Sequence, residues 1–229
     1  MPSIRGLVFD LDGTLIDSVL DIAEAANHAL GVSGYPARSV AEIRGYVGDG
    51  ARVLLARAAE LPVDDAELDP LLERFLDYYT AHPIAHTELL PCVRETLGAL
   101  PPLPLALCTN KPRRTTDVVL AGLELANCFR VIVAGGDLPQ KKPDPAPLRH
   151  IAKQLDVSPA ELVMVGDGPQ DIECARAAGT RSIGVENGIA QRERLLAARP
   201  DAMIPSLCAL PELLRRWQSD PLAIVNEPS

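Results

Sequence analysis

Acidic, hydroxyl, amide and lysine side chains follow apolar segments at several places in the chain, and their chemical types are complementary. Carboxylates favour a hard divalent cation, most simply Mg²⁺. A lysine and a Thr–Asn pair favour an oxyanion. A cation held by carboxylates on one side and facing phosphate on the other is the arrangement that phosphoryl transfer requires. The residues concerned are Asp10 and Asp12, Thr109 and Asn110, Lys142, and Asp167 and Asp171.

The first of these motifs has a simpler interpretation as a calcium-binding loop. Asp10, Asp12 and Gly13 could begin an EF-hand, but that loop needs further oxygen ligands and a distant Glu. Thr14 and Leu15 follow here instead. We therefore disfavour the EF-hand interpretation.

The remaining motifs could also be purely structural. Thr109 and Asn110 could form a strand-end turn, and Lys142 could be a solvated lysine in a proline-rich loop. Asp167 and Asp171 could be a helix N-cap with a first-turn acid. The functional interpretation is favoured because all the motifs follow successive predicted strands, whose carboxyl ends share one edge of a parallel sheet.

The elements that must position these residues are visible as short apolar runs. The runs are rich in Val, Ile and Leu without strict alternation, as in strands buried on both faces of a parallel sheet. Helix-like stretches lie between them, which predicts an α/β fold, a doubly wound parallel-sheet (Rossmann-like) core. The expected strands are 6–10, 103–109, 130–136, 161–167, 181–185 and 201–204, and the expected helices are 112–122, 144–155, 169–178, 189–198 and 206–217.

The segment 17–86 interrupts this alternation, because it contains helix patterns and no strand. It therefore predicts an inserted all-helical cap domain at 17–86, and an α/β catalytic core made of 1–16 and 87–229. The cap helices are expected at 17–31, 39–46, 49–60 and 64–81, with 82–91 as the linker back to the core.

Some helix starts carry their own signals. We expect Asp17 and Ser18 to cap the first cap helix, and Ser39 with Glu42 to form a capping box. The last residues, 219–229, are expected to be a loose end.

Composition limits the class of function. The chain has 229 residues, 47 % of them hydrophobic but only 3 % aromatic, so a sizeable core must consist of Leu, Val, Ile and Ala. A net charge of −9 disfavours a nucleic-acid partner, because binding a phosphate backbone needs a basic face. A small anionic substrate remains compatible. No apolar run has the length of a membrane span and no N-terminal signal pattern is present, so we expect no membrane association and no leader.

The five cysteines, at 92, 108, 128, 174 and 208, are odd in number and form no CxxC motif. We therefore expect neither disulfides nor a zinc site, and a reduced cytoplasmic location. Cys108 could be a thiol nucleophile beside Thr109. Because no His lies nearby in the sequence, we favour a small core residue instead.

The motifs resemble those of the haloacid dehalogenase superfamily, and most closely its phosphoglycolate phosphatase-like branch. The resemblance covers nearly the whole chain. The four superfamily motifs are DxDGT at 10–14, the strand-end Thr109, Lys142 and GDxxxD at 166–171. The branch is indicated by Thr-Asn-Lys-Pro at 109–112, Gly-Gly-Asp at 135–137 and the proline-rich run at 142–148.

Two positions qualify the resemblance. Gly168 stands where many relatives carry Ser or Thr, so a hydroxyl that could support the metal site is missing. Lys141 adjoins Lys142, and we prefer Lys142 because the position before Pro143 matches the family motif.

The resemblance implies a role for each acid of the first motif. Asp10 is the nucleophile, which attacks phosphorus and forms an aspartyl-phosphate. Asp12 protonates the leaving alcohol and then accepts a proton from the attacking water.

The resemblance also implies the binding groups. Mg²⁺ is expected at the Asp10 carboxylate, the Asp12 backbone carbonyl and Asp167, with Asp171 close by. Thr109, Lys142 and neighbouring backbone N–H groups are expected to hold the phosphoryl oxygens. The remaining candidates for substrate binding are Gly13, Asn110, Gly48, Gly50 and Arg52.

The resemblance finally implies that the cap closes over the site, excludes water and recognises the leaving group. The expected recognition segment is 46–52, in which Gly48 and Gly50 allow a tight turn and a close backbone approach. Arg52 or Arg57 could bind a substrate carboxylate through two parallel hydrogen bonds of its guanidinium. Alternatively, each could simply face solvent on a cap helix.

The leading expectation is a Mg²⁺-dependent phosphatase, a monomer or homodimer, that acts on a small phosphorylated metabolite, with 2-phosphoglycolate favoured. Alternatives are a phosphatase for a sugar phosphate or pyrophosphate, and a phosphomutase. A dehalogenase is disfavoured because Asp12 and Asp171 serve phosphate and Mg²⁺ chemistry. A non-catalytic phosphometabolite-binding protein is disfavoured because it would not need Asp12.

Overall fold

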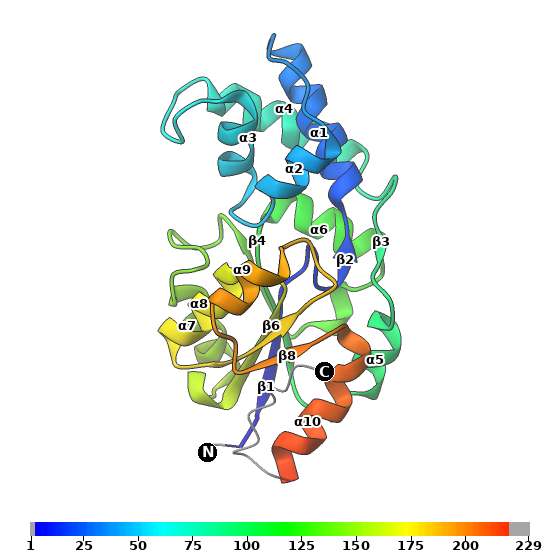
Figure 1. The fold of residues 1–229 in the computed structure, drawn as a ribbon, viewed down its shortest axis with the longest axis vertical. Coiled ribbons are helices and arrows are strands. Elements are labelled where there is room, and N and C mark those ends of the chain that lie inside the picture. Colours follow the sequence, from blue (N-terminus) through cyan, green and yellow to red (C-terminus); the bar gives the residue numbers. More distant parts are fainter. Residues whose placement is uncertain (1–2, 220–229) are drawn as a thin grey trace.

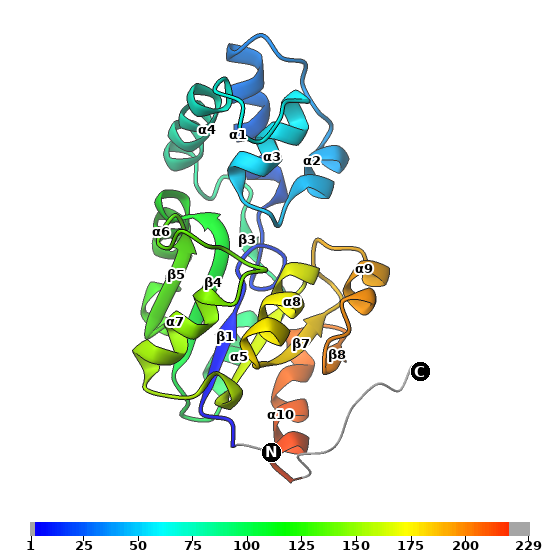
Figure 2. The ribbon, with the colours of Figure 1, turned by 90° about the vertical axis from the view of Figure 1, so that its left-hand side faces the viewer.

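The computed structural model describes residues 3–219. A sheet with helices around it forms the lower part of the molecule in Figure 1, and a separate group of helices lies above it. Figure 2 shows the same two parts from the side. The predicted fold class, an α/β core with an inserted helical cap, is confirmed.

Six parallel strands form the main sheet, in the order β5-β4-β1-β6-β7-β8. The central strand β1 is buried along its whole length, as expected when helices cover both faces. The chain order reverses between β1 and β6, and such a switch point is where α/β sheets bind ligands. The strands are β1 at Gly6–Phe9, β4 at Leu105–Pro112, β5 at Val131–Gly135, β6 at Leu162–Gly166, β7 at Arg181–Val185 and β8 at Ala202–Ile204.

Helices cover both faces of this sheet because successive strand residues point to opposite sides. Val8 packs in the hydrophobic cluster that includes α7 and α8, whereas Leu7 and Phe9 belong to the cluster that includes α6 and α10. The core helices are α5 at Val93–Ala99, α6 at Arg113–Gly122, α7 at Ala146–Leu155, α8 at Pro169–Ala178, α9 at Arg192–Ala197 and α10 at Leu210–Ser219. Short 3₁₀ turns occur at Ala126–Cys128, Pro159–Glu161 and Leu207–Ala209.

The cap has its own packed interior. Its helices α1 and α4 lie against each other, with small buried alanines on α1 facing larger side chains such as Leu71 and Phe75 on α4. The predicted capping box of Ser39 and Glu42 is present at the start of α2. The cap helices are α1 at Val19–Val32, α2 at Val40–Tyr46, α3 at Ala51–Ala59 and α4 at Leu68–Ala81.

The two chain crossings between core and cap lie side by side. β2 at Ile16–Asp17 pairs antiparallel with β3 at Glu88–Leu89. Asp17 is the expected start of the first cap helix, and β3 lies in the expected linker 82–91. Buried Asp21 of α1 accepts hydrogen bonds from the backbone N–H (2.8 Å) and hydroxyl (2.6 Å) of Thr87. The boundaries that we propose between core and cap, at 16/17 and 86/87, therefore lie at or beside the β2–β3 pair.

Capping of α1 follows the prediction only in part. Asp17 Oδ1 accepts a hydrogen bond from the N–H of Val19 at 3.3 Å. Ser18 occupies the N-cap position but makes no side-chain cap bond, because its hydroxyl donates to Asp12 instead.

The prediction that no disulfide forms is wrong. Cys92 and Cys208 form a disulfide with a Cα–Cα distance of 5.3 Å. It links the start of α5, a helix that the sequence analysis missed, to the 3₁₀ turn before α10. The two residues are 116 positions apart, so only the packing of the last helix beside α5 brings them together. Cys108, Cys128 and Cys174 are free.

None of the helices within residues 3–219 is long and apolar enough to cross a membrane. Ser219 ends α10, and the rest of the segment expected to be loose lies outside the described residues.

Candidate active site

The first motif forms a tight loop directly after β1. Asp10 N–H donates to the carbonyl of Val165 at 2.9 Å, which extends the pairing of β1 with β6. Gly13 has a φ of +83°, and its N–H donates to the carbonyl of Ile16 at 2.8 Å. A side chain at Gly13 would lie 2.3 Å from Asp167, so only glycine lets this loop pack against that acid.

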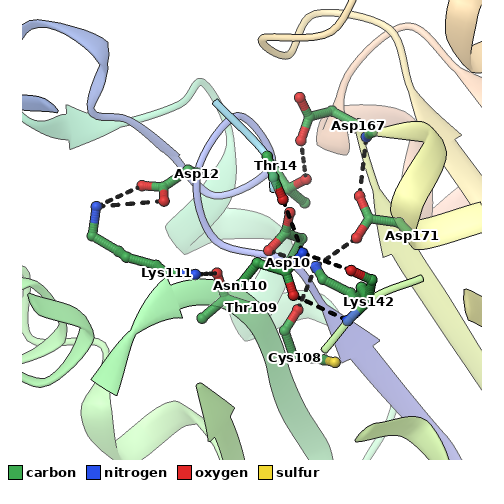
Figure 3. Close-up of polar contacts among 12 residues, drawn as sticks. Asp10, Asp12, Thr14, Cys108, Thr109, Asn110, Lys111, Lys142, Asp167 and Asp171 are labelled. Carbon is green, nitrogen blue, oxygen red and sulfur yellow. Dashed lines mark hydrogen bonds and ion pairs between the residues drawn. The ribbon is translucent and has the colours of Figure 1, made fainter. Parts of the chain in front are cut away.

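Lys142 lies between two buried acids and is itself 1 % exposed (Figure 3). Its Nζ lies 2.9 Å from Asp10 Oδ1, and it donates to Asp171 Oδ1 at 2.6 Å and to the Cys108 carbonyl at 2.7 Å. Burial lowers the pKa of Lys142, but the charges of Asp10 and Asp171 outweigh burial and raise that pKa overall. Lys142 therefore keeps its positive charge between the two carboxylates.

Asp167, at the end of β6, is held by hydrogen bonds to both of its oxygens. Thr14 donates its hydroxyl to Oδ1 at 2.9 Å, and the N–H groups of Ile189 and Ala190 donate to Oδ2 at 2.7 and 3.3 Å. A side chain at Gly188 would meet the Asp167 Cβ at 2.2 Å. The loop after β7 therefore fixes the orientation of this acid.

Asp10, Asp167 and Asp171 form a cluster whose carboxylate oxygens lie within 4.8 Å of one another. Burial and the Asp171 charge raise the pKa of Asp10 to about 7, against the effect of Lys142. Burial and the Asp10 charge raise the pKa of Asp167 to about 6. Burial also raises the pKa of Asp171, although Lys142 opposes it. These buried acids thus lack enough positive charge from the protein alone.

The cluster fits a hard divalent cation. The three acids are buried close together, and Lys142 is the cation that lies against them, at 2.9 Å from Asp10 Oδ1 and 2.6 Å from Asp171 Oδ1. Carboxylate oxygens are the ligands that Mg²⁺ prefers, and a divalent cation would offset the remaining negative charge. Asp10, Asp167 and Asp171 therefore have the donor chemistry and the proximity for the predicted metal site.

Two cavities meet at this site, between the core and the cap. The inner cavity, of about 40 Å³, is lined by core residues Asp10, Asp12, Thr109, Asn110, Lys111, Pro112 and Thr115, and by cap residues Ile22, Val47, Gly48, Gly50, Ala51, Leu54 and Phe75. The outer cavity is much larger, about 530 Å³. Its lining includes Asp12, Asp167, Gly168 and Gln170 together with Arg44, Arg57 and Arg194.

The Asp12 carboxylate points away from the Asp10 cluster (Figure 3). Its Oδ1 accepts hydrogen bonds from the Ser18 hydroxyl at 2.6 Å and from Lys111 Nζ at 3.0 Å. In an extended strand, residues two positions apart lie on the same side, so Asp10 and Asp12 would share a side if β1 continued. β1 ends at Phe9, however, and the chain then turns. Asp10 and Asp12 nevertheless line the same inner cavity.

The end of β4 supplies the polar wall of the inner cavity. Thr109 Oγ1 accepts the N–H of Lys111 at 3.1 Å. Asn110, expected to bind substrate, instead donates its amide to the carbonyls of Gly48 and Lys142, both at 2.9 Å. Asn110 therefore ties the cap to the loop that carries Lys142.

Cys108 lies beneath the site and is 1 % exposed. Burial raises the pKa of its thiol, so the reactive thiolate is disfavoured. The structure thus favours a small core residue over a thiol nucleophile.

The cap reaches the site through two glycines with positive φ. Gly48, with a φ of +120°, lies against Gln170, and Gly50, with a φ of +85°, lies against the Asn110 backbone. A side chain at Gly50 would come within 3.0 Å of the Asn110 carbonyl oxygen. The predicted close approach of this segment to the site is therefore present.

The two candidate arginines lie elsewhere. Arg52 donates to the Val63 carbonyl at 2.8 Å and pairs with Asp69 at 2.6 Å, both within the cap, and it lines neither cavity. Arg57 pairs with Asp49 at 2.6 Å and lines only the outer cavity. The structure therefore brings neither guanidinium to the inner cavity.

Gly168 replaces the expected hydroxyl without disturbing the acids beside it. Its N–H donates to Asp171 Oδ2 at 3.0 Å. The Gln170 side chain lies where a side chain at position 168 would project, 2.2 Å from that point. Gln170 thus fills this space at the rim of the outer cavity.

A family model described as haloacid dehalogenase-like hydrolase matches residues 7–185, which include every motif named above. The chain belongs to the haloacid dehalogenase-like hydrolase family.

Relatives of this hydrolase share nearly its whole length. It is 40 % identical over 221 residues to phosphoglycolate phosphatase of Chromobacterium violaceum, covering 93 % of this chain and 97 % of that protein. It is 39 % identical over 214 residues to phosphoglycolate phosphatase of Pseudomonas putida, covering 90 % and 78 %. A crystal structure of a predicted phosphoglycolate phosphatase from Haemophilus somnus matches with a TM-score of 0.85 at 30 % identity, covering 93 % and 99 %. The chain is therefore a phosphatase of the haloacid dehalogenase-like family.

Some residues of this hydrolase's site were missed by sequence analysis. Thr14 lies within the first motif, yet its bond to Asp167 could not be foreseen from spacing. Lys111 was visible only as part of the Thr-Asn-Lys-Pro signature. The Ile189 and Ala190 N–H groups carry no side-chain signal, and only Gly188 before them indicates a turn at the end of a strand.

Proposed function

We propose that this protein is a Mg²⁺-dependent phosphatase that hydrolyses 2-phosphoglycolate through an aspartyl-phosphate on Asp10. The observation that carries the proposal is the buried set of Asp10, Lys142, Asp167 and Asp171. Asp10 lines the inner cavity beside Asp12, and Asp167 lines the outer cavity. The similarity to phosphoglycolate phosphatases over most of the chain supports the substrate.

Mg²⁺ would be held by Asp10, Asp167 and Asp171, together with the backbone carbonyl of Asp12. When bound, it would neutralise charge on the phosphoryl oxygens and polarise the phosphorus for attack.

The first chemical step would form the intermediate on Asp10. A carboxylate oxygen of Asp10 attacks phosphorus, the bond from phosphorus to the ester oxygen breaks, and Asp12 donates a proton to that oxygen. Lys142 and the Thr109 hydroxyl would hold the phosphoryl oxygens during this transfer. Glycolate then leaves through the cavity.

The second step would release phosphate. Asp12, now a carboxylate, accepts a proton from a water molecule that attacks phosphorus, and the bond between phosphorus and the Asp10 oxygen breaks. Asp10 is thereby regenerated. The Ser18 hydroxyl and the Lys111 ammonium, both bound to Asp12, orient this acid in both steps.

The size of the inner cavity favours a short leaving group. About 40 Å³ is space for a few water molecules, since one water needs on the order of 10–15 Å³ by this measure. A two-carbon acid is of that size. A sugar phosphate is the second candidate, because the outer cavity of about 530 Å³ could hold a larger leaving group.

The test is a comparison of kcat/KM for phosphate release from 2-phosphoglycolate, a hexose phosphate, pyrophosphate and a nucleotide, with Mg²⁺ and with EDTA. We expect 2-phosphoglycolate to exceed the others by at least about tenfold, the selectivity that a few buried contacts provide. EDTA should abolish release. A flat profile would reject 2-phosphoglycolate but not the phosphatase activity, and release of phosphate from none of these esters would favour a binding protein.

A cytoplasmic location and a monomeric or dimeric state remain part of the proposal. The Cys92–Cys208 disulfide counts against a reducing compartment. Size-exclusion chromatography with light scattering tests the oligomeric state, and fractionation of cells tests the location.

A further inference from the structure

Among the described residues that line the inner cavity, Lys111 is the one cationic side chain. It lies at the end of β4, and its side chain is 4 % exposed. The cap wall that faces it is apolar, formed by side chains such as Val47, Leu54 and Phe75. The cavity also holds the carboxylates of Asp10 and Asp12, to which the proposed mechanism gives the phosphorus and the leaving oxygen. Lys111 is therefore the group left to bind a negatively charged part of a small ligand.

The Lys111 ammonium is held from both sides of the cavity. Its Nζ donates to Asp12 Oδ1 at 3.0 Å in the core and to the Tyr79 hydroxyl at 2.8 Å in the cap. The same Nζ lies 4.3 Å from the centre of the Tyr79 ring. Nζ also has a longer contact of 3.4 Å with Asp12 Oδ2, so one N–H is shared between the two oxygens of that carboxylate. An ammonium has three N–H donors, and the Asp12 carboxylate and the Tyr79 hydroxyl leave one for a ligand.

The position of Lys111 relative to Asp12 fixes which part of a substrate it would meet. In the proposed mechanism Asp12 contacts the leaving oxygen, and Lys111 contacts the same Asp12 carboxylate. Two hydrogen bonds through one carboxylate place the ammonium within about 6 Å of that oxygen. A carboxylate on the carbon next to the leaving oxygen reaches across such a gap.

We propose that Lys111 binds the carboxylate of the leaving group, so that this phosphatase selects phosphate esters of short 2-hydroxy acids. The inference rests on the proposed function, because it takes Asp12 as the group beside the leaving oxygen. Tyr79 positions the ammonium from the cap, which makes recognition depend on both domains.

The arginines of the outer cavity are the alternative binding site for such a carboxylate. Arg57, one of the two that lie on the cap, pairs with Asp49 at 2.6 Å. Its side chain is 42 % exposed, so water competes with any ligand there. A buried cation discriminates between charged and neutral ligands more strongly than an exposed one.

The experiment measures binding without turnover. In the Asp10→Asn background, with Mg²⁺, calorimetry would compare 2-phosphoglycolate with 2-hydroxyethyl phosphate, which has the same length but no carboxylate. We expect Asp10→Asn alone to prefer 2-phosphoglycolate by about 10- to 100-fold, the worth of one charge-assisted hydrogen bond. Adding Lys111→Met should erase that preference, and adding Arg57→Met should preserve it. Lys111→Gln, which can still bond to Asp12 and so protects the fold, should erase it too.

The outcomes separate this inference from the proposed function. Equal binding of the two esters by Asp10→Asn, or a preference that survives in either folded Lys111 variant, would overturn the role of Lys111. A preference lost in Arg57→Met but kept in the Lys111 variants would assign the carboxylate to the outer cavity instead. If the preference depends on Lys111 while the wild-type protein releases no phosphate from 2-phosphoglycolate, the inference stands and the proposed activity fails.

Discussion

Lys142 Nζ lies 2.9 Å from Asp10 Oδ1, and this contact joins the loop after β1 to the loop before α7. Because Lys142 also donates to Asp171 at 2.6 Å, one buried ammonium keeps two acids close together. The same ammonium would then face the phosphoryl group that Asp10 attacks. Its role in the fold and its proposed role in catalysis would therefore be linked.

Replacing Lys142 with Met should lower kcat by about 10²–10³-fold, because a preorganised charge at the transferring group is lost. The free energy of unfolding should also fall, by about 3–5 kcal/mol, because Asp10 and Asp171 lose their buried partner. Phosphate release and urea unfolding measure the two effects. Lys141→Met is the matched control, since the Lys141 ammonium donates to the Asp49 carbonyl at the cap and to none of the clustered acids within residues 3–219, so kcat should stay nearly unchanged.

Asp167→Asn should weaken Mg²⁺ activation by about 10- to 100-fold in the concentration needed, because it removes one charged ligand of the proposed cluster. A titration of activity against Mg²⁺ measures this shift. Glu173→Gln is the control, because Glu173 lines the outer cavity but is not in the acid cluster. Equal shifts in the two variants would contradict the assigned cluster.

The stability of the metal-free protein should fall as the pH rises from about 4 to about 7. The pKa of Asp10 is raised to about 7 and that of Asp167 to about 6, so in this range the folded state binds more protons than the unfolded state. Stability therefore decreases with increasing pH, and is lowest above pH 7. Thermal unfolding in EDTA at pH 5 and pH 8 measures it, with about 2–4 °C expected per kcal/mol.

Asp10→Asn supplies the comparison for that pH dependence. The variant lacks the titrating carboxyl, so its melting temperature should rise relative to wild type as the pH increases. Saturating Mg²⁺ should remove most of the difference by stabilising the charged acids of the wild type. A constant difference across this pH range would show that the pKa of Asp10 is not raised.

Gly50→Ala should reduce kcat/KM by about tenfold or more, because its side chain would press on the Asn110 carbonyl and hold the cap away from the site. A residue with a φ of +85° also strains the backbone. Gly34→Ala separates the two effects, since Gly34 has a φ of +81° but no atom within 4 Å of its added side chain. We expect a similar loss of stability in both variants and a loss of activity only at Gly50.

The disulfide can be tested by counting thiols. Without reductant, three of the five cysteines should react after denaturation, and all five should react with reductant. Replacing Cys92 and Cys208 with Ser should lower the unfolding free energy by about 2–4 kcal/mol, given the long loop that the bond closes. Cys128→Ser, at an exposed free cysteine, is the control and should have little effect. Five reactive thiols without reductant would rule out the disulfide.

The strand ends could be predicted because they depend on local patterns. Runs of Val, Ile and Leu give parallel strands, and the carboxyl ends of such strands meet at one edge. From that rule we predicted that Asp10, Lys142, Asp167 and Asp171 lie in one site. The structure places them together. Their catalytic roles, which rest on the family resemblance, stay predictions.

Contacts between elements distant in the chain could not be predicted from those patterns. Nothing local indicates that Tyr79 of a cap helix meets Lys111, that Arg52 bonds within the cap, or that Cys92 pairs with Cys208. Even the direction of Asp12 depends on where β1 stops and the chain turns. The sequence by itself determined the fold class and which groups reach the sheet edge, because backbone periodicity is local. Only the tertiary structure decided which cation lies in the inner cavity between core and cap, because that depends on how the cap packs on the core.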